Sequence, residues 1–311
     1  MASRVIGTFV GEKPGALVIC IGALHGNEPA GVHALEMVFQ QLAAKPELEF
    51  NGRFLGLIGN LGAYSSGIRY VRQDFNRIWF VDRLQQILRR RKSRLQAEDK
   101  ELAELFEIIH HEIEAYKPDR IFFLDLHTTS ANGGIFSIPT GEGPSLQWAK
   151  SLQAPVILDL FKEVDGTLLR FARNGHFVSG GIPIQTLGVA FEAGQHEDFL
   201  AVSRAMLAII NTLTFAGCIE KGSLESPNEQ ELKESAAALP KVTRIIYAHH
   251  IEEDDNFKMR PGYRNFQPIE AGEHLADDAT GPIRSNYNSL ILMPLYQPKG
   301  SDGFFLVKEE E

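Results

Sequence analysis

The amino-acid sequence predicts an α/β protein whose central sheet is at least partly parallel, followed by a small all-β segment. Short, continuous apolar runs alternate with stretches of helical periodicity through the first two thirds of the chain. Such alternation favours βαβ units and parallel strands. After about residue 220 the helical stretches give way to short β-like runs. These two observations together predict the fold class.

The predicted strands of the first part are apolar runs that end in loops. Residues 16–22 form such a run, which stops at Gly22 and Gly26, as a strand buried on both faces does. Further strands are expected at residues 53–60, 120–126, 134–138 and 187–191. Helices are expected at residues 28–43, 82–116 and 199–215, and the charged middle of 82–116 indicates a solvated face or a junction between two helices.

The C-terminal part has a different character. Residues 221–230 are polar and rich in turn-forming residues, which predicts a linker. Beyond it, β-like runs at residues 243–248, 262–266, 289–294 and 303–307 are separated by Gly and Pro. We therefore expect a first domain over residues 1–230 and a small C-terminal β domain over residues 236–311.

Composition and charge exclude several classes of partner. Of the 311 residues, 44% are hydrophobic and 23% charged, the balance of a folded globular protein. The net charge of −9 disfavours nucleic acid. No apolar run approaches the roughly 20 residues that cross a bilayer, and no signal peptide is evident, so we expect no membrane partner and a cytoplasmic location. Cys20 and Cys218 lie in apolar surroundings and are expected to be buried, unpaired residues.

The first predicted strand leads into a motif with two metal-ligand side chains. His25 and Glu28 are three residues apart in the glycine-containing block 22–31, so both can turn toward one point. An imidazole and a carboxylate suit Zn²⁺, and a catalytic zinc ion keeps three protein ligands and one open position. His127 follows another apolar strand, and sites in α/β sheets form where parallel strands end. These three residues are therefore candidates for one metal site.

At this point the same three residues could still be ordinary structural or surface residues that bind no metal. A His-x-x-Glu pair arises often by chance, and a histidine after a strand is more often a hydrogen-bonded structural residue. The neighbouring pairs His110–His111 and His249–His250 are not taken as metal ligands, because adjacent side chains on a helix or strand point apart.

Four separated blocks resemble the aspartoacylase/succinylglutamate desuccinylase family of the zinc carboxypeptidase clan. They are GALHGNEPAG at 22–31, RYVRQDFNR at 69–77, DLHTTS at 125–130 and FEAGQHED at 191–198, in the family's order. The resemblance spans residues 22–198 and implies a carboxypeptidase-like mixed, largely parallel sheet flanked by helices. It also implies one zinc ion per chain, bound by His25, Glu28 and His127.

The resemblance implies roles for four further residues. Glu192 matches the catalytic glutamate, and a carboxylate beside zinc can take a proton from water and return it to a leaving amine. Arg69 matches the arginine that polarises the scissile carbonyl. Asn76 and Arg77 match the pair that grips a substrate carboxylate, which an arginine fork can bind bidentately.

The implied activity is zinc-dependent hydrolysis of the amide bond of a small N-acyl amino acid. Alternatives are a zinc carboxypeptidase acting on small peptides and an inactive homologue that only binds a ligand, and the oligomeric state stays open. The second substrate-binding arginine of aspartoacylase has no clear match, with Arg170 and Arg173 as candidates, and Phe304 and Phe305 stand where a tyrosine is expected. The C-terminal β domain is expected to cap the site and to restrict it to small substrates.

Overall fold

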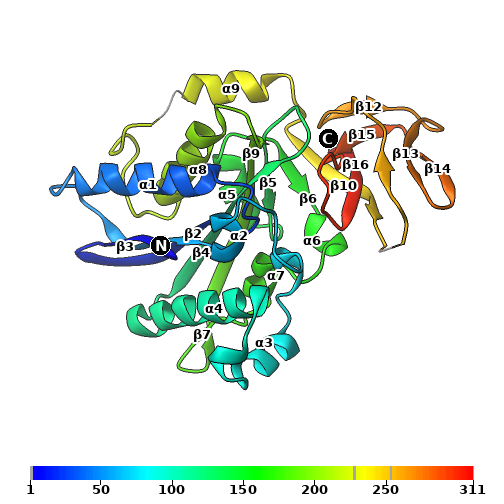
Figure 1. Ribbon diagram of the computed structural model, residues 1–311. Coiled ribbons are helices and arrows are strands. Elements are labelled where there is room, and N and C mark those ends of the chain that lie inside the picture. Colours follow the sequence, from blue (N-terminus) through cyan, green and yellow to red (C-terminus); the bar gives the residue numbers. More distant parts are fainter. Residues whose placement is uncertain (1–2, 227–228, 253, 311) are drawn as a thin grey trace.

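The computed structural model describes residues 3–226, 229–252 and 254–310. Its centre is one eleven-stranded sheet (Figure 1). In spatial order the strands are β1 (Val5–Val10), β3 (Asn51–Ile58), β2 (Lys13–Gly22), β4 (Arg120–Thr129), β9 (Gln185–Gln195), β5 (Phe136–Pro139), β6 (Val156–Leu158), β10 (Val242–His250), β16 (Asp302–Glu309), β15 (Ser289–Leu292) and β12 (Gln267–Ile269).

Four parallel strands form the part of the sheet that carries the site. β3, β2, β4 and β9 pair in parallel, and β5 then pairs antiparallel with β9. The apolar run in β2 is fully buried, as its lack of alternation indicates. The register sets His127 of β4 opposite Glu192 of β9, so two polar side chains from distant parts of the sequence become neighbours.

Helices cover both faces of this sheet (Figure 1). One face packs against α1 (Ala30–Ala43), α5 (Pro144–Ser151), α8 (Ala201–Phe215) and α9 (Glu229–Ala237). The other packs against α3 (Val81–Leu88), α4 (Ala97–Tyr116), α6 (Leu160–Glu163) and α7 (Leu168–Arg173). Two separate apolar clusters result, one on each side of the sheet. No helix among the described residues is long and apolar enough to cross a membrane.

The C-terminal strands extend the same sheet and add a second, small one. β10 pairs in parallel with β6 and antiparallel with β16, so the large sheet runs on into the C-terminal part. A three-stranded sheet of β11 (Lys258–Met259), β13 (His274–Asp278) and β14 (Gly281–Arg284) lies beside it and shares an apolar cluster with β12, β15 and β16 of the large sheet. The segment is therefore built of β-strands, as predicted, while its separation as an independent domain stays a prediction.

Several predicted boundaries differ from those in the structure. Residues 262–266 form turns instead of a strand, because Gly262 and Phe266 have φ values of +98° and +63°, which an extended strand does not allow. The helical stretch 82–116 is two helices joined through a short 3₁₀ turn, η2 (Lys92–Arg94), at the expected junction. Strands β4 and β9 run past the predicted ends, so His127 and Glu192 lie within them.

Several short elements were not predicted from the sequence. They include α2 (Leu61–Ser65), η1 (Phe75–Arg77) and the hairpin of β7 (Val178–Ser179) and β8 (Ile182–Pro183), together with the strands β1 and β6. Most are too short to establish a period.

Candidate metal centre

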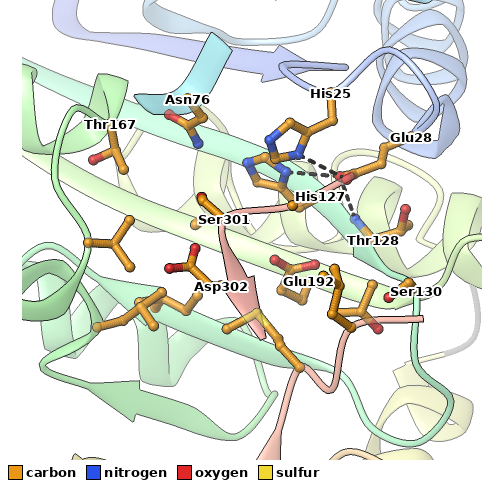
Figure 2. A pocket seen from close by; sticks show the side chains of 18 of the residues that line it. His25, Glu28, Asn76, His127, Thr128, Ser130, Thr167, Glu192, Ser301 and Asp302 are labelled. Atoms are coloured by element: carbon orange, nitrogen blue, oxygen red, sulfur yellow. Dashed lines mark hydrogen bonds and ion pairs between the residues drawn. The ribbon is translucent and has the colours of Figure 1, made fainter. Parts of the chain in front are cut away.

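The three predicted metal ligands lie together and are buried. One nitrogen or oxygen atom from each of His25, Glu28 and His127 lies within 4.8 Å of the other two. Glu28 is between the two imidazoles: its Oε1 is 2.9 Å from Nδ1 of His25 and its Oε2 is 2.9 Å from Nδ1 of His127 (Figure 2). These residues form the only such cluster of three or more among the described parts of the chain.

The loop between β2 and α1 is shaped by close backbone contacts. The N–H of Glu28 donates to the carbonyl of His25 at 3.1 Å, a turn that brings the two side chains to one side. Gly26 packs so tightly against the next loop that a Cβ atom there would lie 2.2 Å from the carbonyl carbon of Ala63. Only glycine therefore fits at position 26, and this close contact constrains the conformation of the block 22–31.

Each of the two histidines contacts an aspartate through its other ring nitrogen, Nε2. His25 Nε2 lies 3.1 Å from Oδ1 of Asp74, and His127 Nε2 lies 2.8 Å from Oδ2 of Asp125. An Nε2–H that donates to a carboxylate leaves the Nδ1 lone pair free, which is the arrangement seen around metal-bound histidines. Both Nδ1 atoms face Glu28, so the three side chains offer converging ligand atoms.

The charges of these residues are strongly coupled. Burial alone would raise the pKa of Glu28, but the two imidazoles, His25 foremost, hold it well below its ordinary value. Burial would lower the pKa of His127, whereas Asp125 and Glu28 raise it well above its ordinary value. Glu28 and His127 therefore stabilise each other's charged forms, an interaction that a bound cation would replace.

Glu192 faces the cluster across a cavity. Its side chain projects from β9 toward the space in front of His127 (Figure 2). Burial raises the pKa of Glu192 to about 8, against the lowering effect of nearby His127. Its Oε2 is buried without a hydrogen-bond partner among the described residues. A buried, unpaired carboxylate is costly, which points to a partner that arrives with the ligand.

The loop of residues 69–77 brings a cation and an amide to the same cavity. Arg69 donates from Nη1 to Glu28 at 3.3 Å and from Nη2 to Asp74 at 3.1 Å, while its buried Nε has no partner in the described chain. Asn76 accepts the backbone N–H of Leu168 at 3.0 Å. Both side chains are thereby fixed in position beside the cluster.

A buried carboxylate of α4 organises this loop. Glu98 is fully buried and accepts the backbone N–H groups of Val71 at 2.6 Å, Arg72 at 3.1 Å and Gln73 at 3.4 Å. The loop then continues into η1, which contains Asn76 and Arg77. The helix that carries Glu98 thus sets the path of the loop that carries the predicted substrate-binding residues.

The cavity has a volume of about 120 Å³ and is lined on one side by apolar side chains. All seven residues predicted for the site line it: His25, Glu28, Arg69, Asn76, Arg77, His127 and Glu192. The apolar wall comprises Ile138, Leu160, Phe161, Val164, Ala190, Met293, Leu295 and Phe305. The roles of the seven in binding and catalysis stay predictions.

The C-terminal segment, which was expected to cap the site, contributes residues to the cavity that were not predicted individually. Gln297, Ser301 and Asp302 line the cavity, and Arg77 forms an ion pair with Asp302. Arg170 and Arg173, the candidates for a second carboxylate-binding arginine, do not line it. Arg170 is instead bonded to the carbonyls of residues 161 and 164 and to the carboxylate of residue 165.

Signals for some of the missed residues were present in the sequence. Asp125 precedes His127 by two positions on a strand, so both point to the same face, and the pair could have been predicted from the alternation.

Phe305 lines the cavity, whereas Phe304 points the other way and stacks on His249. His196 does not line the cavity, but its Nδ1 lies 2.7 Å from the hydroxyl of Thr128, which does.

The fold and the site together define an α/β protein with a buried cluster that could hold one metal ion. The chain matches the model of the succinylglutamate desuccinylase/aspartoacylase catalytic domain over residues 14–206, more than half of its 311 residues. The chain therefore belongs to the succinylglutamate desuccinylase/aspartoacylase family. This family comprises deacylases that act on small acylated amino acids. The predicted family membership is confirmed.

The chain resembles curated members of the family at moderate identity. It is 30% identical over 129 residues to a probable aspartoacylase from Acaryochloris marina, a match that covers 41% of this chain and 39% of that protein. It is 27% identical over 285 residues to succinylglutamate desuccinylase from Pseudomonas paraeruginosa, covering 88% of this chain and 78% of that one. The chain thus matches less than half the length of the aspartoacylase relative.

Solved structures share the fold over nearly the whole chain. A succinylglutamate desuccinylase/aspartoacylase from Rhodobacter sphaeroides superposes with a TM-score of 0.66 at 18% identity, covering 98% of this chain and 88% of that one. Murine aminoacylase 3 superposes with a TM-score of 0.60 at 19% identity, covering 96% of each chain. At these identities the likeness shows the fold alone, and it confirms the predicted fold class.

Proposed function

We propose that this chain is a zinc-dependent deacylase, which hydrolyses the amide bond of a small N-acyl amino acid. The observation that carries the proposal is the buried His25–Glu28–His127 cluster with the unpaired carboxylate of Glu192 facing it. Membership in a deacylase family supports the reaction class. The same membership leaves the acyl group and the amino acid open.

The donor set fits zinc. Two imidazole nitrogens and one carboxylate are the ligands of many catalytic zinc sites, which keep a further position open. Asp74 and Asp125 supply the carboxylates behind the histidines that fix the ring orientation. When bound there, zinc would polarise a carbonyl and lower the pKa of a water molecule to about 7.

The residues of the chain would perform the remaining steps. Glu192 takes a proton from the attacking water and delivers it to the amine nitrogen as the amide bond breaks. Its burial and raised pKa suit a group that both accepts and returns a proton. Arg69 has a free Nε–H that can donate to the carbonyl oxygen as negative charge develops there.

Asn76 and Arg77 would hold the carboxylate of the amino acid. Each side chain is anchored by a backbone contact of its own, Asn76 at the N–H of Leu168 and Arg77 at the carbonyl of Asn76. Such anchoring reduces the entropy that is lost when a substrate binds. The small cavity favours this reaction over cleavage of a longer peptide, since pockets for larger ligands measure roughly 300–1,000 Å³.

Metal content and activity test the proposal together. Purified protein should hold one zinc ion per chain, and Glu28→Ala and His127→Ala should lose it, whereas the control His111→Ala, at an exposed position on α4, should keep it. Glu192→Gln should keep zinc and lose at least about a hundredfold of the activity on N-acyl amino acids, in line with general acid–base catalysis. Zinc retained at full stoichiometry by both ligand variants would contradict the metal assignment.

A further inference from the structure

Arg77, the predicted carboxylate-binding residue, is already paired with a carboxylate of the protein. Its Nη2 lies 2.5 Å from Oδ2 of Asp302, and its Nη1 donates to the carbonyl of Asn76 at 2.8 Å. Asp302 is the first residue of β16 and projects into the cavity (Figure 2). Two segments that lie 225 residues apart in the sequence thus meet in one ion pair inside the cavity.

Asp302 is also held from its other side. Its Oδ1 lies 2.8 Å from Nδ1 of His250, the last residue of the neighbouring strand β10. The side chain is mostly buried, with 12% of its surface exposed. A carboxylate restrained at both oxygens stays beside Arg77 when a ligand enters, so it belongs to the binding surface that a ligand meets.

This carboxylate changes the charge that a substrate would encounter. Arg69 and Arg77 are the arginines among the described residues that line the cavity, and no lysine lines it. Arg69 already faces Glu28 and Asp74, and Arg77 faces Asp302. A substrate with one carboxylate can share Arg77 with Asp302, but a second carboxylate would find no free cation in this part of the chain.

A free ammonium group on the substrate would complete the pattern of charges. It would donate to the carboxylate of Asp302 while the substrate carboxylate accepts from Arg77, so that opposite charges alternate around the site. The hydroxyl of Ser301, buried and unpaired among the described residues, lies next to Asp302 in the chain and lines the same cavity. It provides a further polar contact for such a group.

We propose that Asp302 determines specificity by selecting N-acyl amino acids that carry a free ammonium group and by rejecting those that carry a second carboxylate. The substrate class is thus an N-acylated diamino acid. This inference rests on the proposed function for the reaction, but the charge selection itself is a property of binding. It can therefore be measured on the amino acid that the reaction would release as well as on the amide.

The experiment uses three ligands that differ at the end of the side chain. Ornithine ends in an ammonium group, norvaline in a methyl group and glutamate in a carboxylate. Binding of each to the zinc-loaded protein is measured by calorimetry, and hydrolysis of the Nα-acetyl derivatives is measured in parallel. The variants are Asp302→Asn, which keeps the shape and removes the charge, and Asp159→Asn as control.

The control removes a matched ion pair outside the cavity. Asp159 lies 2.5 Å from an arginine nitrogen, Nη1 of Arg244, the same distance that joins Asp302 to Arg77. Neither residue of the control pair lines the cavity. Melting temperature and zinc content of both variants show whether each is folded and loaded.

The wild-type protein and the control should bind ornithine about 10- to 100-fold more tightly than norvaline, the range of one charge-assisted hydrogen bond. Glutamate should bind more weakly than norvaline. Asp302→Asn should reduce the ornithine preference to about threefold or less and should improve glutamate binding. Hydrolysis should follow the same order in kcat/KM.

The outcomes separate the two proposals. Equal binding of ornithine and norvaline by the wild-type protein, tighter binding of glutamate, or an ornithine preference that Asp302→Asn retains would each overturn the role of Asp302. Discrimination in binding without hydrolysis of any acetyl derivative would count against the proposed function and leave the charge selection standing.

Discussion

Replacing Glu98 with glutamine should destabilise the protein and displace the loop of residues 69–77. Glutamine keeps the volume of the side chain but exchanges one carboxylate oxygen for an amide group that can only donate. Three backbone N–H groups, of Val71, Arg72 and Gln73, converge on the two oxygens of the wild-type side chain. At least one of these donors loses its acceptor in the variant.

The magnitude follows from the burial of the site. Glu98 is 0% exposed, so water does not replace the lost acceptor. A buried polar group left unpaired costs about 1–3 kcal/mol, and hydrogen bonds to a charged group contribute about 1.5–3 kcal/mol. We expect a loss of about 2–4 kcal/mol in the free energy of unfolding. For a chain of this size that corresponds to a fall of roughly 3–6 °C in melting temperature.

The assay compares thermal unfolding of Glu98→Gln with that of Asp99→Asn. Asp99 is the next residue of the same helix and also loses a carboxylate oxygen, but it is partly exposed and pairs with Arg83 at 2.7 Å. An ion pair of this kind contributes about 0–1 kcal/mol, so the control should shift by about 2 °C at most. Equal melting temperatures for the two variants would refute the role given to Glu98.

Activity gives a second readout of the same change. The loop carries Arg69, Asn76 and Arg77, and a displacement of about 1 Å in such positioning groups can lower the rate by about a hundredfold. Glu98→Gln should therefore lower kcat/KM by about 10- to 100-fold at temperatures where it is fully folded, with zinc content unchanged. A stable, fully active variant would show that the loop holds its path without this carboxylate.

Three further predictions concern the cluster and the thiols. Asp125→Asn should weaken zinc binding by about 10- to 100-fold in a competition titration with a chelator, because the amide holds His127 less well; unchanged affinity would contradict this. Since the folded pKa of Glu192, about 8, exceeds its ordinary value of 4.5, its contribution to the stability of the zinc-free protein falls as pH rises between these values. The melting temperature of zinc-free Glu192→Gln, taken relative to that of the zinc-free wild type, should therefore rise from pH 5 to pH 8. A difference in melting temperature that stays constant over this range would refute the raised pKa of Glu192. Burial raises the pKa of Cys20 and brings that of Cys218 to about 12, so neither thiol should react with a thiol reagent at pH 8 until the protein unfolds, and modification of the native protein would contradict their burial.

The parts of the fold that the sequence predicted are those specified by local pattern. The short apolar runs in β2 and β4 are typical of buried strands, and the helical spacing of α1 and α8 identifies the elements beside them. The short strand β6 and the turns around Phe266 lack a repeated pattern. Their conformation depends on partners far along the chain, such as β10 for β6.

The candidate site likewise contains some residues that the sequence predicts and others that it does not. His25 and Glu28 share one loop, and His127 ends up beside them because β2 and β4 are parallel neighbours. The resemblance to a known family supplied Glu192, which the register of β4 and β9 then sets opposite His127. The resemblance places Phe304 and Phe305 near the substrate, but nothing in the sequence points to Asp302 itself, because its place in the cavity depends on how β16 adds to the sheet through β10.

The continuation of the sheet from β6 into β10 has a consequence for how such a protein can change over evolution. The cluster, Glu192 and Arg69 all come from residues 25–192, whereas one wall of the cavity comes from residues 293–305. The residues predicted to carry the reaction and the proposed specificity residue Asp302 therefore lie in two stretches of sequence that can vary separately. Substitutions in the later stretch can redirect the protein to a new ligand while the residues expected to carry the chemistry stay as they are.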